Sequence, residues 1–139
     1  MELRKGRHVV SCLHAHMVFV PRYRKGVFDC DAIEKLHRIF RIVCADFETD
    51  LKEFNGEKDH VHLLIEYPPK INLSGLVNSL KGVSSRRLRQ ERPDIAKKYW
   101  KGGLWSASYF VGSVGGAPLE VLKKYIQSQQ KGGGNSSPA

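Results

Sequence analysis

The sequence is poor in cysteine and in long apolar runs, and each shortage excludes a class of protein. Its 3 cysteines, Cys12, Cys30 and Cys44, are scattered among 139 residues, which fits reduced thiols better than a disulfide framework or a zinc knuckle. No run of about 18 apolar residues offers a membrane span. No continuous apolar core follows the basic N-terminal residues, as it would in a signal peptide. We therefore expect a cytoplasmic protein that has no membrane partner.

Acidic residues are scarce as well, and the resulting charge points to a polyanionic partner. The chain has 14 Asp and Glu against 23 Lys and Arg, so its net charge is +9 and its isoelectric point is near 9.6. Solubility does not explain a bias towards one sign, whereas a small basic domain is expected to bind nucleic acid. The length fits one domain, which we place at residues 1–130, and we expect the Gly- and Ser-rich tail 131–139 to be disordered.

The stretch 59–67 predicts a short strand with two unlike faces. Apolar and polar residues alternate along it, and successive side chains of a strand point to opposite sides of the sheet. His60 and His62 therefore share one face, roughly 7 Å apart, close enough for one cation to bridge them. Two histidines at this spacing also occur as ordinary polar residues on a solvated sheet. His14 and His16 form a second such pair in the first predicted strand.

The remaining patterns predict a sheet of four strands, two helices between them and a final helix. Asp31 with Glu34 resembles a capping box, and Asn55-Gly56 between two strand candidates is a hairpin signal. The predicted elements are strands 8–20, 49–54, 59–67 and 104–111, helices 31–47 and 119–130, and one helix that Asn72 caps and that ends before Pro93. This β-α-β-β-α-β order with an added C-terminal helix is that of α+β ferredoxin-like (RRM-like) domains. In that fold both crossover helices cover one face of an antiparallel sheet and leave the other face open.

Two basic segments are candidates for contact with nucleic acid. The loop after the first strand can grip a phosphate backbone and stack a base, and the end of the second helix can contact phosphates. The alternatives are a solvated turn and a favourable positive charge at a helix C-terminus. The candidate DNA-binding residues are Arg22, Tyr23, Arg24, Lys25, Arg86, Arg87 and Arg89.

The predicted final helix carries Tyr125 and Gln129 four residues apart and hence on one face. If this helix lies over the open sheet face, a phenol and an amide meet His60 and His62. Such a set suits phosphoryl transfer to tyrosine, because a cation held by neutral ligands keeps its charge to neutralise a phosphodiester. A phenol, with an ordinary pKa of about 10, is a poor nucleophile at neutral pH unless a metal and good alignment help it. A surface aromatic residue and a solvated amide are the alternative.

Four motifs in the same order resemble those of the single-tyrosine HUH transposases of small insertion sequences, over residues 8–130. They are Pro21-Arg22-Tyr23-Arg24-Lys25, Asp59-His60-Val61-His62-Leu63-Leu64, Leu104-Trp105-Ser106-x-Ser108-Tyr109-Phe110-Val111 and Lys124-Tyr125-Ile126-x-x-Gln129. The resemblance implies that His60 and His62 bind the metal, that Gln129 is the third ligand and that Tyr125 is the nucleophile. It also implies that His14 and His16 are not ligands, although His16 can stand near the site.

The resemblance further implies what the protein acts on. Members of the family bind folded single-stranded DNA ends as homodimers, cut them with Mg²⁺ or Mn²⁺ through a 5′-phosphotyrosine, and rejoin strands without a nucleotide cofactor. Imidazole also suits Zn²⁺, and Glu66, on the strand face of His60, can replace Gln129 as a ligand. Two other hypotheses stay open. One is a non-catalytic nucleic-acid-binding module on the same fold, and the other is a nuclease of the same chemistry that serves the host on chromosomal repeats.

Overall fold

The computed structural model describes residues 4–5, 10–11, 13–24, 26–99, 103–113 and 127 of the chain. In chain order the elements are β1 (Arg4–Lys5), β2 (Val10–Ser11), β3 (Leu13–Pro21), the 3₁₀ turn η1 (Arg22–Arg24), α1 (Cys30–Asp46), β4 (Asp50–Glu57), β5 (His60–Tyr67), α2 (Leu73–Glu91), α3 (Pro93–Lys98) and β6 (Trp105–Ser113). Within these ranges, each helix is too short or too polar to cross a bilayer.

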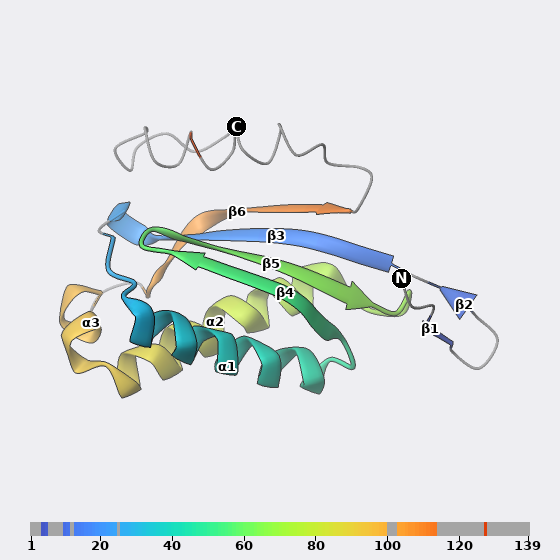
Figure 1. The fold of residues 1–139 in the computed structure, drawn as a ribbon, viewed down its shortest axis with the longest axis horizontal. Helices are drawn as coiled ribbons and strands as arrows, with labels where there is room; N and C mark the ends of the chain where they lie inside the picture. The colour runs from blue at the N-terminus through green and yellow to red at the C-terminus, as the bar shows by residue number, and fades with distance from the viewer. Residues whose placement is uncertain are drawn as a thin grey trace.

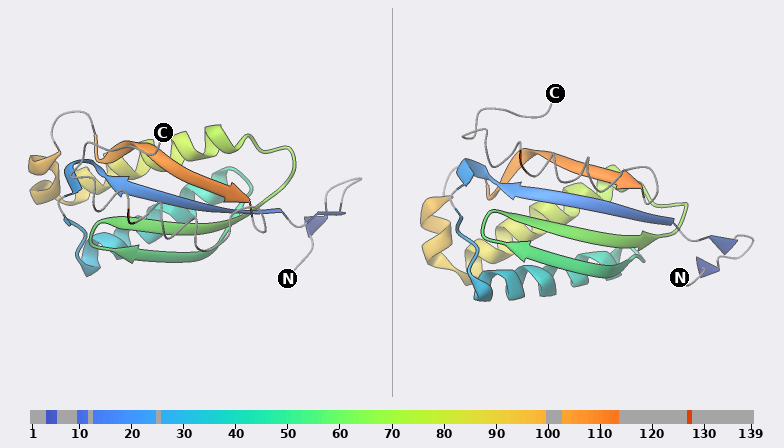
Figure 2. Two further views of the ribbon diagram at one scale, coloured as in Figure 1. Left: turned by 90° about the horizontal axis from the view of Figure 1, so that it is seen from above. Right: turned by 45° about the horizontal axis from the view of Figure 1, so that its top comes forward.

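Four strands form one antiparallel sheet in the order β4-β5-β3-β6 (Figures 1 and 2). With α1 between β3 and β4, and α2 and α3 between β5 and β6, the chain follows the predicted β-α-β-β-α-β order. The ferredoxin-like α+β fold is therefore confirmed. The first strand is shorter than predicted, because Val10–Ser11 pairs with Arg4–Lys5 in a separate ribbon and β3 begins only at Leu13.

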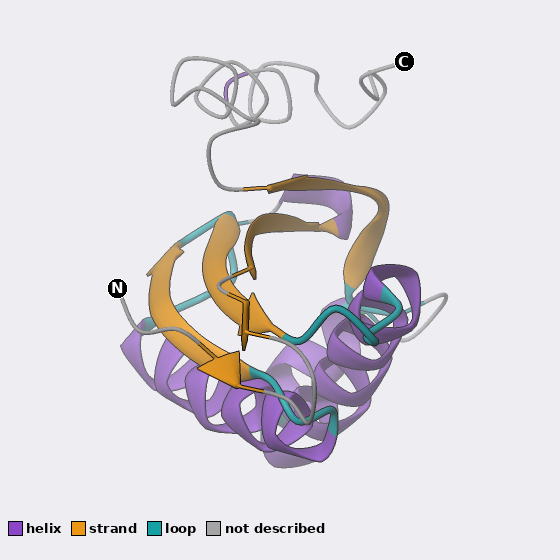
Figure 3. Ribbon diagram, turned by 90° about the vertical axis from the view of Figure 1, so that its right-hand side faces the viewer, coloured by secondary structure: helices purple, strands orange, loops and turns teal. Residues whose placement is uncertain are grey.

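Helices α1 and α2 lie together on one face of the sheet, as the end view in Figure 3 shows. The core between the two layers takes every second residue of the central strands. Met17 and Phe19 of β3, and Leu63 and Ile65 of β5, are fully buried there, and each contributes about 1.5–3 kcal/mol by leaving water. We call the side of the sheet that faces away from α1 and α2 the outer face.

Helix α1 begins at Cys30 because Asp29, and not Asp31, caps it. The Oδ1 atom of Asp29 accepts a hydrogen bond from Ala32 N at 2.8 Å. It thereby satisfies one of the N–H groups in the first turn that have no partner within the helix. The predicted capping box at Asp31 is therefore wrong, and Asp31 pairs with Lys35 one turn further along. Apolar residues at helical spacing form one stripe along α1, in which Leu36, Phe40, Val43 and Cys44 are buried and Ile33 and Phe47 are half-buried.

The β4–β5 hairpin turns at Lys58 and Asp59, so the predicted turn at Asn55-Gly56 is wrong. Both Asn55 and Gly56 lie within β4 and pair with β5. A Cβ atom added at position 56 would lie 2.5 Å from Cδ1 of Ile33 on α1. The glycine is therefore needed for the close approach of strand and helix rather than for a turn.

Helix α2 begins after Asn72 as predicted, and the Asn72 side chain accepts a hydrogen bond from Gly75 N at 3.3 Å. Pro93 does not simply follow the end of a helix, because it opens the short helix α3, which was not predicted. Proline suits the first turn of a helix, where its missing N–H donor is not required. The predicted helix 119–130 and tail 131–139 lie outside the described residues except for Gln127, so the one-domain boundary at 130 stays a prediction.

Candidate active site

Strand β5 places His60 and His62 on the outer face of the sheet, as predicted. The alternating residues Val61, Leu63 and Ile65 are fully buried on the side of α1 and α2, whereas the two histidines are half-buried. The strand therefore separates an apolar set from a pair of imidazoles that face away from the helices.

Asp59 supports the ring of His60. The Nδ1 atom of His60 lies 3.0 Å from Oδ1 of Asp59, and because an ionised carboxylate only accepts hydrogen bonds, Nδ1 carries the proton. The lone pair on His60 Nε2 is then left for a ligand, and such carboxylate support is usual for metal-bound imidazole. Asp59 had no role in the sequence prediction, although its position next to His60 was visible in the motif.

His16 of β3 contacts His62 across the strand pair, so its predicted position near the site is confirmed. The Nδ1 atom of His16 lies 2.9 Å from Nε2 of His62, and the two rings stack with centroids 5.1 Å apart. Burial lowers the pKa of His62 below its ordinary 6.5, the charge of His16 lowers it further, and Glu53 opposes both. His62 is therefore neutral at neutral pH, the form that binds metals. While the contact with His16 is kept, Nδ1 is the His62 ring nitrogen that would be left for a metal ion.

Glu66 lies on the outer face but at the other end of β5. Its buried Oε2 atom is 3.5 Å from Nε2 of His14 and 4.0 Å from Nζ of Lys52. Four residues along a strand place it roughly 13 Å from His62. Among the described residues, no three His, Cys, Asp or Glu side chains lie close enough to hold an ion together. The suggestion that Glu66 replaces Gln129 as a ligand is therefore wrong.

Tyr125 and Gln129 lie outside the described residues, as do Lys25 and the side chain of Arg24, so their roles stay predictions.

The donors that are described fit a divalent cation. Two imidazoles share one face of one strand, burial keeps one of them neutral, and a carboxylate supports the other. Such a pair leaves positions around the ion for a third ligand and for phosphate oxygens.

The 3₁₀ turn η1 presents an aromatic ring at the end of the sheet where β5 begins. Tyr23 is 55% exposed, its ring stacks on that of buried Tyr99 with centroids 6.0 Å apart, and the Arg22 guanidinium lies 5.3 Å from its centroid. The φ angle of Tyr23 is 66°, in the left-handed region that costs a non-glycine residue about 1–2 kcal/mol. Strained exposed residues cluster at binding sites, and an exposed ring beside a cation suits the stacking of a base.

The predicted basic residues of α2 lie at the same end of the molecule as Tyr23. Arg89 and Tyr23 both contact Tyr99. The Nη1 atom of Arg89 donates to the carbonyl oxygen of Tyr99 at 3.4 Å, and the Tyr23 ring stacks on the Tyr99 ring. Of its neighbours, Arg86 is exposed and Arg87 is half-buried. The fold therefore gathers two basic segments that lie more than 60 residues apart in the sequence.

Comparison with known proteins finds relatives that match nearly the whole chain. The family described as "Transposase IS200 like" matches residues 9–129. The chain is 33% identical over 129 residues to the ISDra2 transposase TnpA of Deinococcus radiodurans, which covers 93% of this chain and 92% of that protein. It is 32% identical over 114 residues to the transposase for insertion sequence element IS200 of Salmonella typhimurium, which covers 82% of this chain and 74% of that protein.

Two solved structures share the fold. The crystal structure of a candidate transposase from Deinococcus radiodurans matches with a TM-score of 0.83 and 30% identity, over 91% of this chain and 97% of that chain. The structure of a REP-associated tyrosine transposase bound to a REP hairpin matches with a TM-score of 0.56 over 95% of this chain and 75% of that chain. Its identity of 12% supports a common fold and nothing finer.

Proposed function

The chain belongs to the family of IS200-like transposases, and we propose that it cuts and rejoins single-stranded DNA through a covalent bond between Tyr125 and a 5′ phosphate. One observation carries the proposal. His60 and His62 stand side by side on the outer face, one supported by Asp59 and the other kept neutral by burial. Such a pair can hold a divalent cation, which would assist phosphoryl transfer to a phenol.

The residues that would hold the cation are His60, His62 and Gln129, and the family resemblance favours Mg²⁺ or Mn²⁺. When bound, the cation would neutralise negative charge on the phosphodiester that is cut. Asp59 holds the proton at Nδ1 of His60 and so keeps the Nε2 lone pair for a ligand. His16 restrains the His62 ring through their 2.9 Å contact.

In the proposed reaction, the phenol oxygen of Tyr125 displaces the 3′ oxygen at the scissile phosphorus. Tyrosine loses its proton, the bond between phosphorus and O3′ breaks, and the departing strand gains a proton as it leaves with a 3′-hydroxyl. One phosphodiester is exchanged for another. A 3′-hydroxyl can therefore attack the phosphotyrosine and reseal a strand without ATP.

We propose that the basic end of the molecule binds DNA with hairpin ends, and that the protein acts as a homodimer. Tyr23 can stack a base while the arginines contact phosphates. The proposed DNA-binding residues are Arg22, Tyr23, Arg24, Lys25, Arg86, Arg87 and Arg89. A protein of the same fold is bound to a hairpin, which supports such a substrate. Sedimentation of the full chain tests the dimer.

Formation of a covalent protein–DNA adduct tests the function. The full chain is incubated with labelled single-stranded hairpin oligonucleotides and Mg²⁺ or Mn²⁺, and a denaturing gel separates the adduct from free DNA. We expect an adduct that disappears with EDTA and in Tyr125→Phe. Tyr67→Phe, which removes the same hydroxyl group from a half-buried residue at the end of β5, should keep it. An adduct in Tyr125→Phe would refute the nucleophile. DNA binding without an adduct to any hairpin would favour the non-catalytic module.

A further inference from the structure

An open surface pocket of about 380 Å³, which we call the cavity, lies between helix α2 and the start of strand β6, outside the proposed active site. Three cationic side chains of α2 and three residues that lead into β6 form its walls. They are Lys81, Arg86 and Arg89 on the helix and Gly103, Leu104 and Trp105 opposite. Lys81 was not predicted as a DNA-binding residue, although its spacing of eight residues from Arg89 places both on one helix face.

Buried hydrogen bonds fix the two walls of the cavity relative to each other. The backbone N of Leu104 donates to Oγ of Ser85 at 3.0 Å, and Nε1 of Trp105 donates to Oγ of Ser84 at 2.8 Å. Both serines are buried, so separating α2 from β6 would leave buried polar groups unsatisfied. The cavity is therefore part of the folded structure and does not depend on a ligand to form it.

Two of the three cations around the cavity are held in place by carbonyl oxygens, and Arg86 is exposed. Lys81 donates to the carbonyl oxygen of Ser106 at 2.8 Å, and Arg89 donates to that of Ser85 at 3.0 Å. In the part of the chain that the structure describes, no carboxylate pairs with Lys81, Arg86 or Arg89. Other cations of the same helix layer differ, since Lys35, Arg38 and Arg92 all form ion pairs. The positive charge around this cavity thus lacks a counter-charge within the described structure.

We propose that this cavity binds one backbone phosphate of the substrate DNA, with Arg86 and Lys81 as its main contacts and Arg89 as a fixed positive charge. The inference rests on the proposed function, which supplies the DNA. Because Lys81 and Arg89 are already held beside the cavity, they favour an anion there without further rearrangement. A strand bound here is held at the end of the sheet where His60 begins β5.

The salt dependence of DNA affinity tests the proposal. Binding of the full chain to a labelled hairpin oligonucleotide is measured without metal at a series of NaCl concentrations. We expect Arg86→Gln and Lys81→Gln each to weaken binding roughly tenfold. Each should also reduce the slope of log affinity against log salt by about 0.7–0.9, which is the loss of one phosphate contact. Arg41→Gln removes the same charge from an exposed position on α1, and its affinity should fall less than twofold.

A pair of substitutions at Gly82, which lines the cavity, distinguishes the effect of charge on DNA binding from the effect of side-chain shape. A Cβ atom at Gly82 meets nothing within 4 Å, so a side chain can begin there without a clash, and Gly82→Gln and Gly82→Glu have the same shape but differ in charge. The glutamate variant should bind DNA about tenfold more weakly than the glutamine variant. Equal binding by these two variants, or an unchanged salt slope in Arg86→Gln and Lys81→Gln, would overturn the phosphate site. Adduct formation by the wild type is read separately, so the cavity proposal can fail while the proposed function stands.

Discussion

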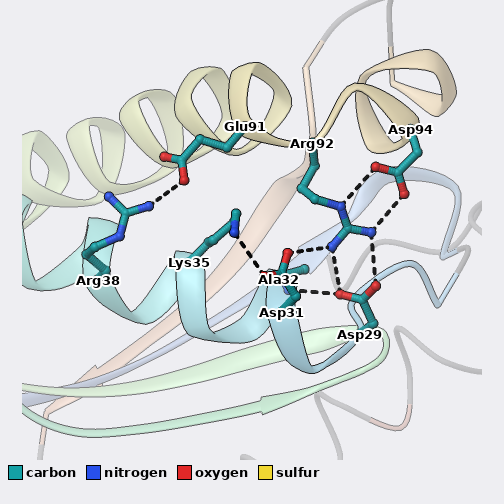
Figure 4. Close-up of polar contacts among 8 residues, drawn as sticks. All are labelled: Asp29, Asp31, Ala32, Lys35, Arg38, Glu91, Arg92 and Asp94. Carbon is teal, nitrogen blue, oxygen red and sulfur yellow. Dashed lines mark hydrogen bonds and ion pairs between the residues drawn. The ribbon is translucent and has the colours of Figure 1, made fainter.

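Removing the guanidinium of Arg92 should weaken the fold measurably, because this one group joins three elements. Arg92 lies between α2 and α3 and donates two hydrogen bonds to Asp29 and two to Asp94, all at 2.8–2.9 Å, and one to Asp31 at 3.0 Å (Figure 4). Asp29 is also the N-cap of α1 through its bond to Ala32 N. Arg92 thereby fastens the start of one helix to the junction of two others.

The Asp29 pair sets the magnitude that we expect for Arg92→Gln. Because Asp29 is 56% exposed, solvent screens the pair, and even its two-pronged geometry contributes only about 1 kcal/mol. Loosening the capping carboxylate adds up to about 1 kcal/mol. The free energy of unfolding should therefore fall by about 1–2 kcal/mol at pH 7. Urea unfolding followed by circular dichroism measures this loss.

The pH dependence of that loss is a second, independent check. Hydrogen bonds from Arg92 hold the pKa of Asp29 and of Asp94 at about 2, below the ordinary 3.8. As the pH falls, the unfolded chain takes up these protons first, so the stabilisation is complete above about pH 4 and disappears towards pH 2. The difference between wild type and Arg92→Gln should be constant from pH 7 to 5 and shrink below pH 4.

The matched control for this prediction is Arg38→Gln. Arg38 also connects α1 to α2, but it pairs with Glu91 alone, and its side chain is 50% exposed. Its loss should cost less than about 1 kcal/mol. The reasoning is refuted if Arg92→Gln and Arg38→Gln destabilise the protein equally at pH 7, or if the effect of Arg92→Gln is undiminished at pH 2.5.

Three further predictions concern single positions. Gly56→Ala should lower the free energy of unfolding in urea by about 1–3 kcal/mol, because its Cβ atom would lie 2.5 Å from Ile33. Gly82→Ala, whose Cβ atom would lie in open space within α2, should raise it by up to about 1 kcal/mol. His16→Ala should weaken Mn²⁺ binding roughly 10–100-fold in calorimetry, because it removes the support of the His62 ring; an unchanged affinity would show that the contact does not position the ligand. Since burial lowers the pKa of His62 below 6.5, its imidazole should be mostly neutral at pH 6.5, which an NMR titration of the His62 ring in the metal-free protein measures; a midpoint above pH 6.5 would contradict the shift.

Local patterns sufficed to predict the parts of the fold that depend on side-chain alternation. The pairing of a polar set with a fully buried apolar set along β5 follows from the period of a strand. The stripe of α1 and the cap of α2 at Asn72 follow from the period and the end chemistry of helices. Once two helices of this kind separate four strands, few topologies remain, and the observed one is a common member of that set.

The predictions that failed concern contacts between distant segments. A glycine suits a tight turn, and it also suits a strand that lies close to a helix, as Gly56 does beneath Ile33. The residues next to Gly56 in the sequence do not show which of the two applies. Asp29 and Asp31 are both able to cap a helix, and the position of Arg92, more than 60 residues away, favours Asp29. The contact of His16 with His62 depends in the same way on a strand register that the sequence does not display.

The position of the histidine pair is enforced by the core and not by the site itself. A slip of β5 by one residue would exchange the two faces of the strand, turning His60 and His62 into the core and exposing Val61, Leu63 and Ile65. Each of these three apolar side chains is fully buried and would lose about 1.5–3 kcal/mol on exposure. Placing a histidine against the helices would cost further free energy, because its polar ring atoms would lack partners there. The strand register that packs the core is therefore the one that places both imidazoles on the outer face. No further interaction is needed to fix that register.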